Sequence, residues 1–364
     1  MKNNKVKLTL KIILFVLSLL IAVFACYVIY CFGSYKRIDD FQDLEINKSK
    51  SQTELQTQNL KIDNEYKAVS YNIGFAAYLH DFSFFMDGGT QSWAKSKDSV
   101  IETSENIGNY LNDLNADFYS LQEVDSNSTR TYHVDETEII KEKMNKFSSV
   151  DAVCFDSPFL MYPITQPHGA SVSNLMTLSK YLPYSSLRRQ LKVDDGFTKI
   201  LDYDRCYSIT RYKVENGKDF VLFTTHTSAY AKDPSTSNSQ IEMLVGNMQS
   251  ELEKGNYVIC AADFNKQLVD DTSKYYKPER IYECKPFPKQ YLAGTGISLV
   301  APFNEKKPVG TCRDAGVNYF DDIPICNIDG FMVSSNIEVC FSDVCDTKFE
   351  FSDHNPVFMT FKLK

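Results

Sequence analysis

This sequence of 364 residues lacks several motifs that would point directly to a class of function. It has no Cys-x-x-Cys pair, which argues against a structural zinc cluster. It also has no glycine-rich phosphate loop and no Gly-x-Ser-x-Gly elbow. Positive charge is scarce, with 39 Lys and Arg against 47 Asp and Glu and a net charge of −8, whereas nucleic-acid binders are usually basic. A hydrolase needs only a local positive patch or a bound metal to meet phosphate, so this charge excludes no phosphoesterase.

What the sequence does contain is ample material for a core. Hydrophobic residues make up 43% of the chain, including 25 Phe and 22 Tyr. Length and composition together favour one large α/β domain with an appendage, and disorder is not expected away from the termini.

The appendage is an apolar run near the N-terminus, from Ile12 to Phe32, which is long enough to span a bilayer. Four lysines precede it, so we expect residues 1–11 in the cytoplasm and the rest of the chain outside. Tyr27 to Tyr30 stand where a signal peptidase would need small residues, which favours an uncleaved anchor over a signal peptide. Residues 33–60 are polar and without periodicity, which indicates a linker before a domain at 61–364.

Eight cysteines follow the anchor, an even number that permits disulfides in an extracytoplasmic domain. Cys206 and Cys260 lie in apolar runs and are predicted to be buried thiols. Cys312–Cys326 and Cys340–Cys345 are the candidate pairs.

From Tyr66 the chain alternates strand-like and helix-like segments without an internal repeat. Asp98 is predicted to cap a helix that runs to Leu114. Glu215-Asn216-Gly217-Lys218 predicts a hairpin turn between two apolar runs. These features predict a sandwich of two sheets flanked by helices.

Short polar motifs stand at the ends of the apolar runs, where an α/β scaffold usually presents its chemistry. They are Tyr71-Asn72-Ile73-Gly74, Leu121-Gln122-Glu123-Val124-Asp125, Thr225-His226-Thr227, Ala262-Asp263-Phe264-Asn265, Ile328-Asp329-Gly330-Phe331 and Ser352-Asp353-His354-Asn355-Pro356. Together they supply the carboxylates, amides and imidazoles that hold a hard divalent cation and hydrolyse a phosphate ester. Each motif alone has an ordinary alternative, such as a turn for Asp263 to Asn265 or a packed imidazole for either histidine.

Two further features leave alternatives open. Arg130 and Arg205 could contact phosphate, although solvated surface arginines are the more frequent case. The aromatic stretch from Tyr78 to Met86 could stack on bases, insert into lipid or pack in the core.

Taken in order, the motifs resemble the endonuclease/exonuclease/phosphatase superfamily, the fold of pancreatic deoxyribonuclease, sphingomyelinases and inositol-polyphosphate 5-phosphatases. The resemblance covers Tyr66 to Lys364 and implies a four-layered α/β sandwich of two mixed β-sheets flanked by helices, here preceded by one transmembrane helix. The histidine of Thr225-His226-Thr227 separates the chain from apurinic endonucleases, which lack it.

The resemblance also implies roles for the motif residues. Glu123 would be the principal Mg²⁺ ligand, with Asn72 beside it and Asp353 as a second metal-site ligand; Mn²⁺ is the alternative metal. Asp263 would orient or deprotonate the attacking water, and Asn265 would contact the scissile phosphate. His354, paired with Asp329, would be the general acid/base or phosphate-stabilising imidazole, and His226 a second imidazole near the phosphate.

The sequence therefore predicts a membrane-anchored, metal-dependent phosphoesterase that hydrolyses a phosphodiester, first of all in nucleic acid. A lipid phosphodiesterase or an inositol-phosphate phosphatase is the alternative, favoured by the tether to a bilayer. A non-catalytic binding module on the same fold is the third possibility. Nothing in the sequence points to a protein partner.

Overall fold

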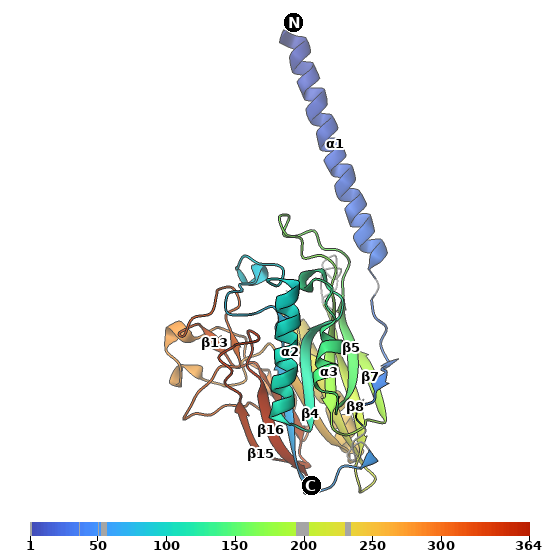
Figure 1. The fold of residues 1–364 in the computed structure, drawn as a ribbon, viewed down its shortest axis with the longest axis vertical. Coiled ribbons are helices and arrows are strands. Elements are labelled where there is room, and N and C mark those ends of the chain that lie inside the picture. The colour runs from blue at the N-terminus through green and yellow to red at the C-terminus, as the bar shows by residue number, and fades with distance from the viewer. Residues whose placement is uncertain (1, 36, 50, 52–56, 194–203, 230–233) are drawn as a thin grey trace.

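Two β-sheets packed face to face form the body of the protein, and helices cover their outer faces (Figure 1). The structure, a computed structural model, describes residues 2–35, 37–49, 51, 57–193, 204–229 and 234–364. Each sheet has seven strands. The four-layered sandwich predicted from the sequence is thereby confirmed.

The first sheet has the strand order β1-β7-β8-β9-β10-β14-β11. Its strands are β1 (Gln42–Asp43), β7 (Ser185–Gln190), β8 (Cys206–Lys213), β9 (Asp219–His226), β10 (Tyr257–Asp263), β14 (Asp329–Ser334) and β11 (Ile297–Val300). Strands β9 and β10 run parallel, whereas β14 runs antiparallel to β10. The sheet is therefore mixed. The predicted hairpin joins β8 to β9, and Gly217 there adopts a φ of +81°, which glycine tolerates without strain.

The second sheet has the order β15-β16-β3-β4-β6-β5-β2. Its strands are β15 (Ile337–Val344), β16 (Val357–Leu363), β3 (Glu65–Asn72), β4 (Phe118–Asp125), β6 (Val172–Ser179), β5 (Ser148–Asp156) and β2 (Ile46–Asn47). Strands β3 and β4 form its parallel pair. A separate two-stranded ribbon, β12 (Cys312–Arg313) with β13 (Ile325–Cys326), lies beside the sandwich.

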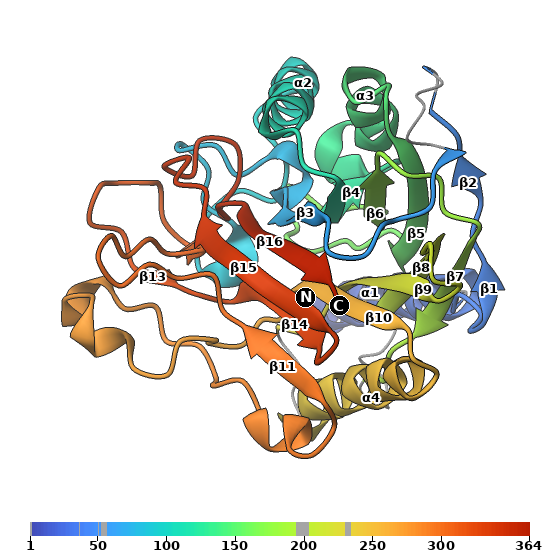
Figure 2. The same ribbon diagram turned by 90° about the horizontal axis from the view of Figure 1, so that it is seen from below.

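Three apolar layers hold the sandwich together. Figure 2 shows the two sheets and the outer helices between which these layers lie. Between the sheets, Phe118 and Phe361 of the second sheet pack with Phe220 of the first. Helix α4 (Pro234–Glu253) covers the outer face of the first sheet, and α2 (Lys97–Leu114) and α3 (Glu136–Lys143) cover that of the second. Strand β10 is buried along its whole length because both of its faces are covered, which explains its uninterrupted apolar sequence.

Two predictions about local structure are corrected. Helix α2 is capped by Ser96, whose Oγ accepts a hydrogen bond from the Ser99 amide at 3.0 Å, and Asp98 lies in its first turn instead. In the part of the chain described here every cysteine is a free thiol. Cys312 does lie opposite Cys326 in the ribbon. Cys340 and Cys345 cannot meet, because the five residue steps of extended chain from one to the other span roughly 16 Å.

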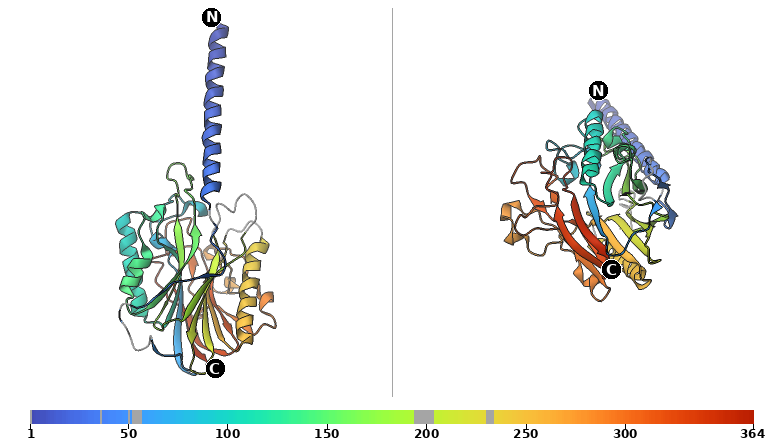
Figure 3. Two further views of the ribbon diagram at one scale, coloured as in Figure 1. Left: turned by 90° about the vertical axis from the view of Figure 1, so that its right-hand side faces the viewer. Right: turned by 60° about the horizontal axis from the view of Figure 1, so that its bottom comes forward.

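The N-terminal helix α1 (Lys2–Ser34) projects from one end of the sandwich (Figure 3). Its segment Lys5–Ser34 has the length and composition of a membrane span, with a mean hydropathy of 3.1 over an 18-residue window, although a signal sequence shares these properties. Of the predicted linker, residues 36, 50 and 52–56 lie outside the described part. The rest does not hang free: β1 pairs with β7, β2 pairs with β5, and Leu60 is buried between the sheets.

Candidate active site

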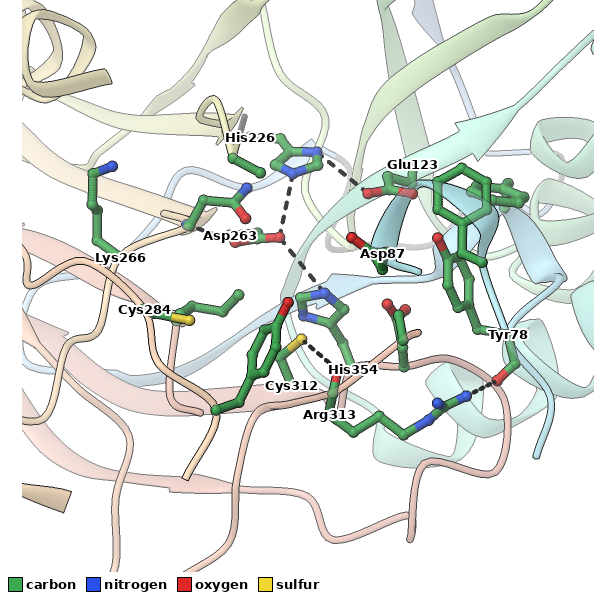
Figure 4. A pocket seen from close by; sticks show the side chains of 18 of the residues that line it. Tyr78, Asp87, Glu123, His226, Asp263, Lys266, Cys284, Cys312, Arg313 and His354 are labelled. Carbon is green, nitrogen blue, oxygen red and sulfur yellow. Dashed lines mark hydrogen bonds and ion pairs between the residues drawn. The ribbon is translucent and has the colours of Figure 1, made fainter. Parts of the chain in front are cut away.

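The polar motifs meet at one edge of the sandwich because the strands that precede them end there. In the first sheet, Asp263 at the end of β10 lies opposite His226 at the end of β9 and opposite Asp329 at the start of β14. In the second sheet, Asn72 at the end of β3 lies opposite Gln122 of β4. The two sheets thus bring their functional ends together over a shared pocket (Figure 4).

Glu123 reaches this pocket through an irregularity in β4. The pairing of β4 with β6 shifts between Leu121 and Val124, and Glu123 within the shift has a φ of +56°. A bulge of this kind re-aims a side chain, at the cost of a backbone conformation that non-glycine residues rarely adopt. The Glu123 side chain is 17% exposed, which leaves its carboxylate accessible from the pocket.

Asn72 joins the two sheets at the site. Its Nδ2 donates to Glu123 Oε1 at 3.0 Å and to Asp263 Oδ2 at 3.1 Å, and its Oδ1 accepts from the Gly74 amide at 3.0 Å. All three contacts require the same orientation of the Asn72 side-chain amide, in which its nitrogen points toward the two carboxylates. Asn72 therefore fixes the separation of Glu123 and Asp263, and its predicted role as a metal ligand stays a prediction.

His354 is held by Asp329, as the sequence suggested. The His354 Nδ1 atom lies 2.9 Å from Asp329 Oδ2, and its Nε2 faces Asp263 Oδ2 at 3.7 Å. Burial alone would lower the pKa of His354, but the Asp329 carboxylate outweighs it and raises the pKa well above its usual range. This imidazole is therefore kept positively charged.

His226 is the opposite case. Its Nε2 lies 3.3 Å from Asp263 Oδ2 and its Nδ1 lies 3.8 Å from Glu123 Oε1. Burial, together with the positive charges of Arg205 and His354, lowers the pKa of His226 well below its usual range. One imidazole of the pair is charged and the other neutral, so the two have different chemistry available to them.

The carboxylates are destabilised as anions. Burial and the charge of Asp329 raise the pKa of Asp263 to about 7. Burial and the charge of Asp353 likewise raise the pKa of Glu123. Perturbed carboxyl groups in a cleft are typical of functional sites, because folding alone gives no reason to collect like charges there.

Asn265 and Asp353 complete the predicted set at the pocket wall. The Asn265 amide donates to Asp263 Oδ1 at 2.8 Å, and its Nδ2 donates to the Thr227 carbonyl at 2.8 Å. Asp353 accepts from Ser352 Oγ at 3.2 Å. All eight predicted residues therefore lie in one region. The side-chain amide nitrogen of Asn265, however, is bonded to the Thr227 carbonyl and does not point into open space.

Basic residues that sequence reasoning undervalued also line the pocket, namely Arg130, Arg205, Lys266, Lys285 and Arg313. The expectation that Arg130 and Arg205 are solvated is wrong, since they are 1% and 4% exposed. Arg130 forms a bidentate pair with Asp125 and stacks on Phe75. Lys266 follows Asn265 directly, so its place was available from the motif. Arg313 gave no such signal because the β12–β13 ribbon positions it.

The aromatic stretch after Asn72 packs mainly in the core. Tyr78, Phe82 and Phe84 are buried against one another, whereas Met86 is 54% exposed. Tyr78 and Phe84 also line the pocket. Of the three alternatives, core packing accounts for most of the stretch.

The donor atoms fit a hard cation at Glu123 and Asp353. Both carboxylates face the pocket, and the charge of one raises the pKa of the other, so a divalent ion between them would relieve a repulsion already present. Two other groups have ligand atoms close together, Cys312 with Asp353 and His354, and Asp263 with Asp329 and His354. Both include His354, whose Nδ1 is paired with Asp329, and the first adds a soft sulfur that Mg²⁺ does not favour.

Comparison with known proteins supports the fold. No protein-family model and no curated protein matches the sequence. Among solved structures, an endonuclease/exonuclease/phosphatase from Beutenbergia cavernae superposes with a TM-score of 0.56 at 14% identity, over 82% of this chain and 72% of that one. A Leptotrichia buccalis family protein gives 0.53 at 12% identity, over 82% and 100%. The human Nocturnin catalytic domain with bound sulfate gives 0.52 at 13% identity, over 88% and 98%.

Proposed function

We propose that this chain, which has the endonuclease/exonuclease/phosphatase fold, is a metal-dependent phosphoesterase that cleaves a phosphodiester by attack of water. One observation carries the proposal: Asn72 bridges Glu123 and Asp263 while His226 and His354 face the same Asp263 oxygen. A core serving stability alone would not concentrate two perturbed carboxyls and two imidazoles around one pocket.

Glu123 and Asp353 would hold the metal, Mg²⁺ or alternatively Mn²⁺. The bound ion would offset negative charge on the phosphoryl oxygens and on the leaving alkoxide. The chain itself orients these two carboxylates, because Asn72 donates a hydrogen bond to Glu123 and Ser352 donates one to Asp353.

The remaining residues position and move protons. Asp263 Oδ2 is held by Asn72, and Asp263 Oδ1 by the Asn265 amide, so this carboxylate is oriented to accept a proton from the attacking water. His354, kept charged by Asp329, donates an N–H to a phosphate oxygen as negative charge develops there. Neutral His226 adds a second N–H donor at the same face of the pocket.

The basic wall suits a phosphate-bearing substrate. Arg205, Lys266 and Arg313 place positive charge around a pocket of about 260 Å³ in a chain whose net charge is −8. Nucleic acid is the first substrate to test. The second candidate is a lipid or inositol phosphate, favoured by the apolar surface that lies between this pocket and helix α1.

The test uses the purified full chain with Mg²⁺ or with EDTA. The substrates are plasmid DNA, RNA, vesicles containing sphingomyelin or phosphatidylinositol, and soluble inositol phosphates. We expect hydrolysis of one of them to require the metal, and Glu123→Gln to lower turnover by roughly 100-fold or more, because it removes a charge that meets the metal. The matched control is Glu102→Gln, an exposed position on α2.

The outcomes separate the candidates. Metal-dependent nicking of DNA or RNA would make the protein a nuclease, and cleavage confined to vesicles or inositol phosphates would make it a lipid or inositol-phosphate esterase. Parental turnover in Glu123→Gln would remove this residue from the mechanism. No hydrolysis of any substrate by a folded protein would favour the non-catalytic binding module.

A further inference from the structure

A second surface of the protein is apolar where most loops are polar. The loop of residues 157–168 is the larger part of the connection between β5 and β6, and it extends beyond the sandwich on the side of α1 (Figures 1 and 3). Ile164 is 87% exposed, Tyr162 70% and Met161 52%. From 157 to 179 the sequence contains no Asp, Glu, Lys or Arg. An exposed apolar patch of this kind marks an interaction surface.

The loop is fastened to helix α1. The Tyr27 hydroxyl donates to the Phe159 carbonyl at 3.1 Å and accepts from the Met161 amide at 3.1 Å. The Phe159 amide donates to the Tyr30 hydroxyl at 3.2 Å. These contacts fix the loop relative to the helix, so the position of one determines the position of the other.

An apolar groove separates the loop from the helix. Helix residues between Leu20 and Phe32 form one wall, and Met161, Tyr162 and Ile164 contribute to the other. Leu20 and Phe32 are about 18 Å apart along the helix axis at 1.5 Å per residue. Both lie within the apolar run 12–32 that is expected to cross the bilayer. If that run spans the membrane, the loop must lie at the depth of the helix residues that it contacts, Tyr27 and Tyr30.

The groove continues toward the catalytic pocket. Phe85 and Met86 line the groove, while their neighbours Phe84 and Asp87 line the pocket. His168 at the end of the loop packs against both Phe84 and Phe85. One short segment therefore separates the apolar surface from the site of chemistry.

We propose that the loop 157–168 and Met86 form a membrane-docking surface that inserts into the leaflet through which α1 leaves the bilayer. A lipid bilayer fits this surface because the loop is uncharged, its tip is apolar and it lies beside the C-terminal half of the spanning segment. Because the loop is fastened to α1, insertion would hold the sandwich with the neighbouring pocket near the headgroups. The proposal requires α1 to span the membrane, and it is independent of which phosphate ester is hydrolysed.

The test reads insertion without reference to activity. The full chain is reconstituted in phosphatidylcholine vesicles whose acyl chains carry bromine, which quenches nearby tryptophan. Ile164→Trp and Met86→Trp place the probe at the two ends of the surface, and the unsubstituted chain supplies the background from Trp93, its single native tryptophan. Phe341→Trp is the matched control, because Phe341 is 52% exposed on β15 at the far edge of a sheet.

We expect each probe on the surface to lose roughly half of its emission in brominated vesicles, because an interfacial side chain lies about 5–10 Å into the headgroup and acyl boundary. The Phe341→Trp probe should be unchanged. Quenching at neither surface position, at only one of them, or equally at Phe341→Trp would overturn the proposal. A second copy of the chain covering the loop would also overturn it, and would show as emission that depends on protein density with no effect of bromine.

Discussion

At the scale of residues, the site is built from conformations that stability alone would avoid. Glu123 and Asn265 have φ values of +56° and +48°, in the left-handed region that most side chains disfavour. Asparagine tolerates this region, whereas for glutamate it costs on the order of 1 kcal/mol or more. Each residue is overdetermined by neighbours, Glu123 by Asn72 and Asn265 by Asp263 and Thr227. The surrounding sandwich supplies the stability that offsets this strain.

Gly74 lies at a position where the site leaves no room for a side chain. Its φ is +55°, and a Cβ added there would stand 2.6 Å from the Tyr78 ring and 3.0 Å from Asp353 Oδ1. A glycine at this position lets the backbone after Asn72 pass close to Asp353. The motif Tyr71-Asn72-Ile73-Gly74 is therefore a geometric requirement as well as a chemical one.

Asp329→Asn tests whether the charge behind His354 matters. Asparagine has nearly the same shape and can still accept from His354 Nδ1, but it no longer stabilises the imidazolium. We expect turnover of the substrate identified for the parent to fall roughly 100-fold or more, the usual contribution of a positioned acid or base. Thermal unfolding should change little, because the side chain fits the same space.

His354→Ala in the same assay is the companion variant. It should lose at least as much activity as Asp329→Asn, and combining the two should add little, since both act through one imidazole. Additive losses would contradict the pairing of Asp329 with His354 as one functional unit.

At the scale of elements, the strand ends position the polar side chains of the site. A group of hydrogen-bonded side chains around Glu251, which we call the clip, attaches helix α4 to the first sheet. Arg211 of β8 forms two hydrogen bonds of 2.8 Å with the Glu251 carboxylate on α4. Asn256 and Lys254 donate to the same group. Burial opposes the charge of Glu251, but these donors outweigh it and lower the pKa from 4.5 to about 2. The clip therefore ties the outer helix to the sheet beneath it.

Glu251→Gln should lower the free energy of unfolding by about 2 kcal/mol at pH 7, because buried donors lose a charged acceptor. A carboxylate whose pKa is lowered by folding stabilises the protein fully above pH 4.5, and this stabilisation is lost as the pH falls toward 2. The difference between parent and variant should shrink over that range in urea unfolding experiments.

Glu253→Gln is the matched control for this clip, since Glu253 is exposed on the same turn of α4. It should change the free energy of unfolding by less than about 0.5 kcal/mol. A Glu251→Gln variant as stable as this control at pH 7 would contradict the role of the clip.

At the scale of the whole molecule, the segment after α1 ties the helix to the sandwich. Strand β1 forms one edge of the first sheet by pairing with β7, and β2 forms one edge of the second sheet by pairing with β5. Arg188, fully buried, donates to the carbonyls of Asp39, Val153 and Asp204 at 3.0, 2.9 and 2.8 Å. The sandwich therefore cannot turn freely beneath α1.

Arg188→Met should destabilise the protein by about 3 kcal/mol, because three carbonyls, one buried and two part-buried, lose a charged donor. Its neighbour Arg189 is partly exposed and pairs with Asp40, so Arg189→Met should cost only about 1 kcal/mol or less. Thermal unfolding of both variants gives the comparison. Equal losses would contradict the special role of Arg188.

Orientation in the membrane is a prediction at the same scale. The lysines before Ile12 predict that the N-terminus lies in the cytoplasm and the sandwich outside. Protease added to right-side-out vesicles from an expression host should degrade the domain, whereas inside-out vesicles should protect it. The opposite pattern would place the sandwich in the cytoplasm, and a mature chain without its first 30 or so residues would identify α1 as a cleaved signal.

The sequence by itself determined the secondary-structure elements and which polar residues are candidates for the site. Strands such as Tyr257–Asp263 and the hairpin at Gly217 are written in local pattern, because periodicity and turn preferences act over a few residues. The motif residues were likewise visible, since polar groups that end apolar runs stand out. The Asp98 cap failed because Ser96 competes for the same helix end, and local sequence does not rank two adequate caps.

Only the tertiary structure decided what these groups do to one another. The bridge from Asn72 to two carboxylates, the opposite pKa shifts of His226 and His354, and the burial of Arg130 arise between segments far apart in the chain. The contact of the loop 157–168 with α1 is of the same kind. Such contacts depend on how the two sheets and helix α1 pack against one another. The separation of two residues along the chain does not give the distance between them across the sandwich.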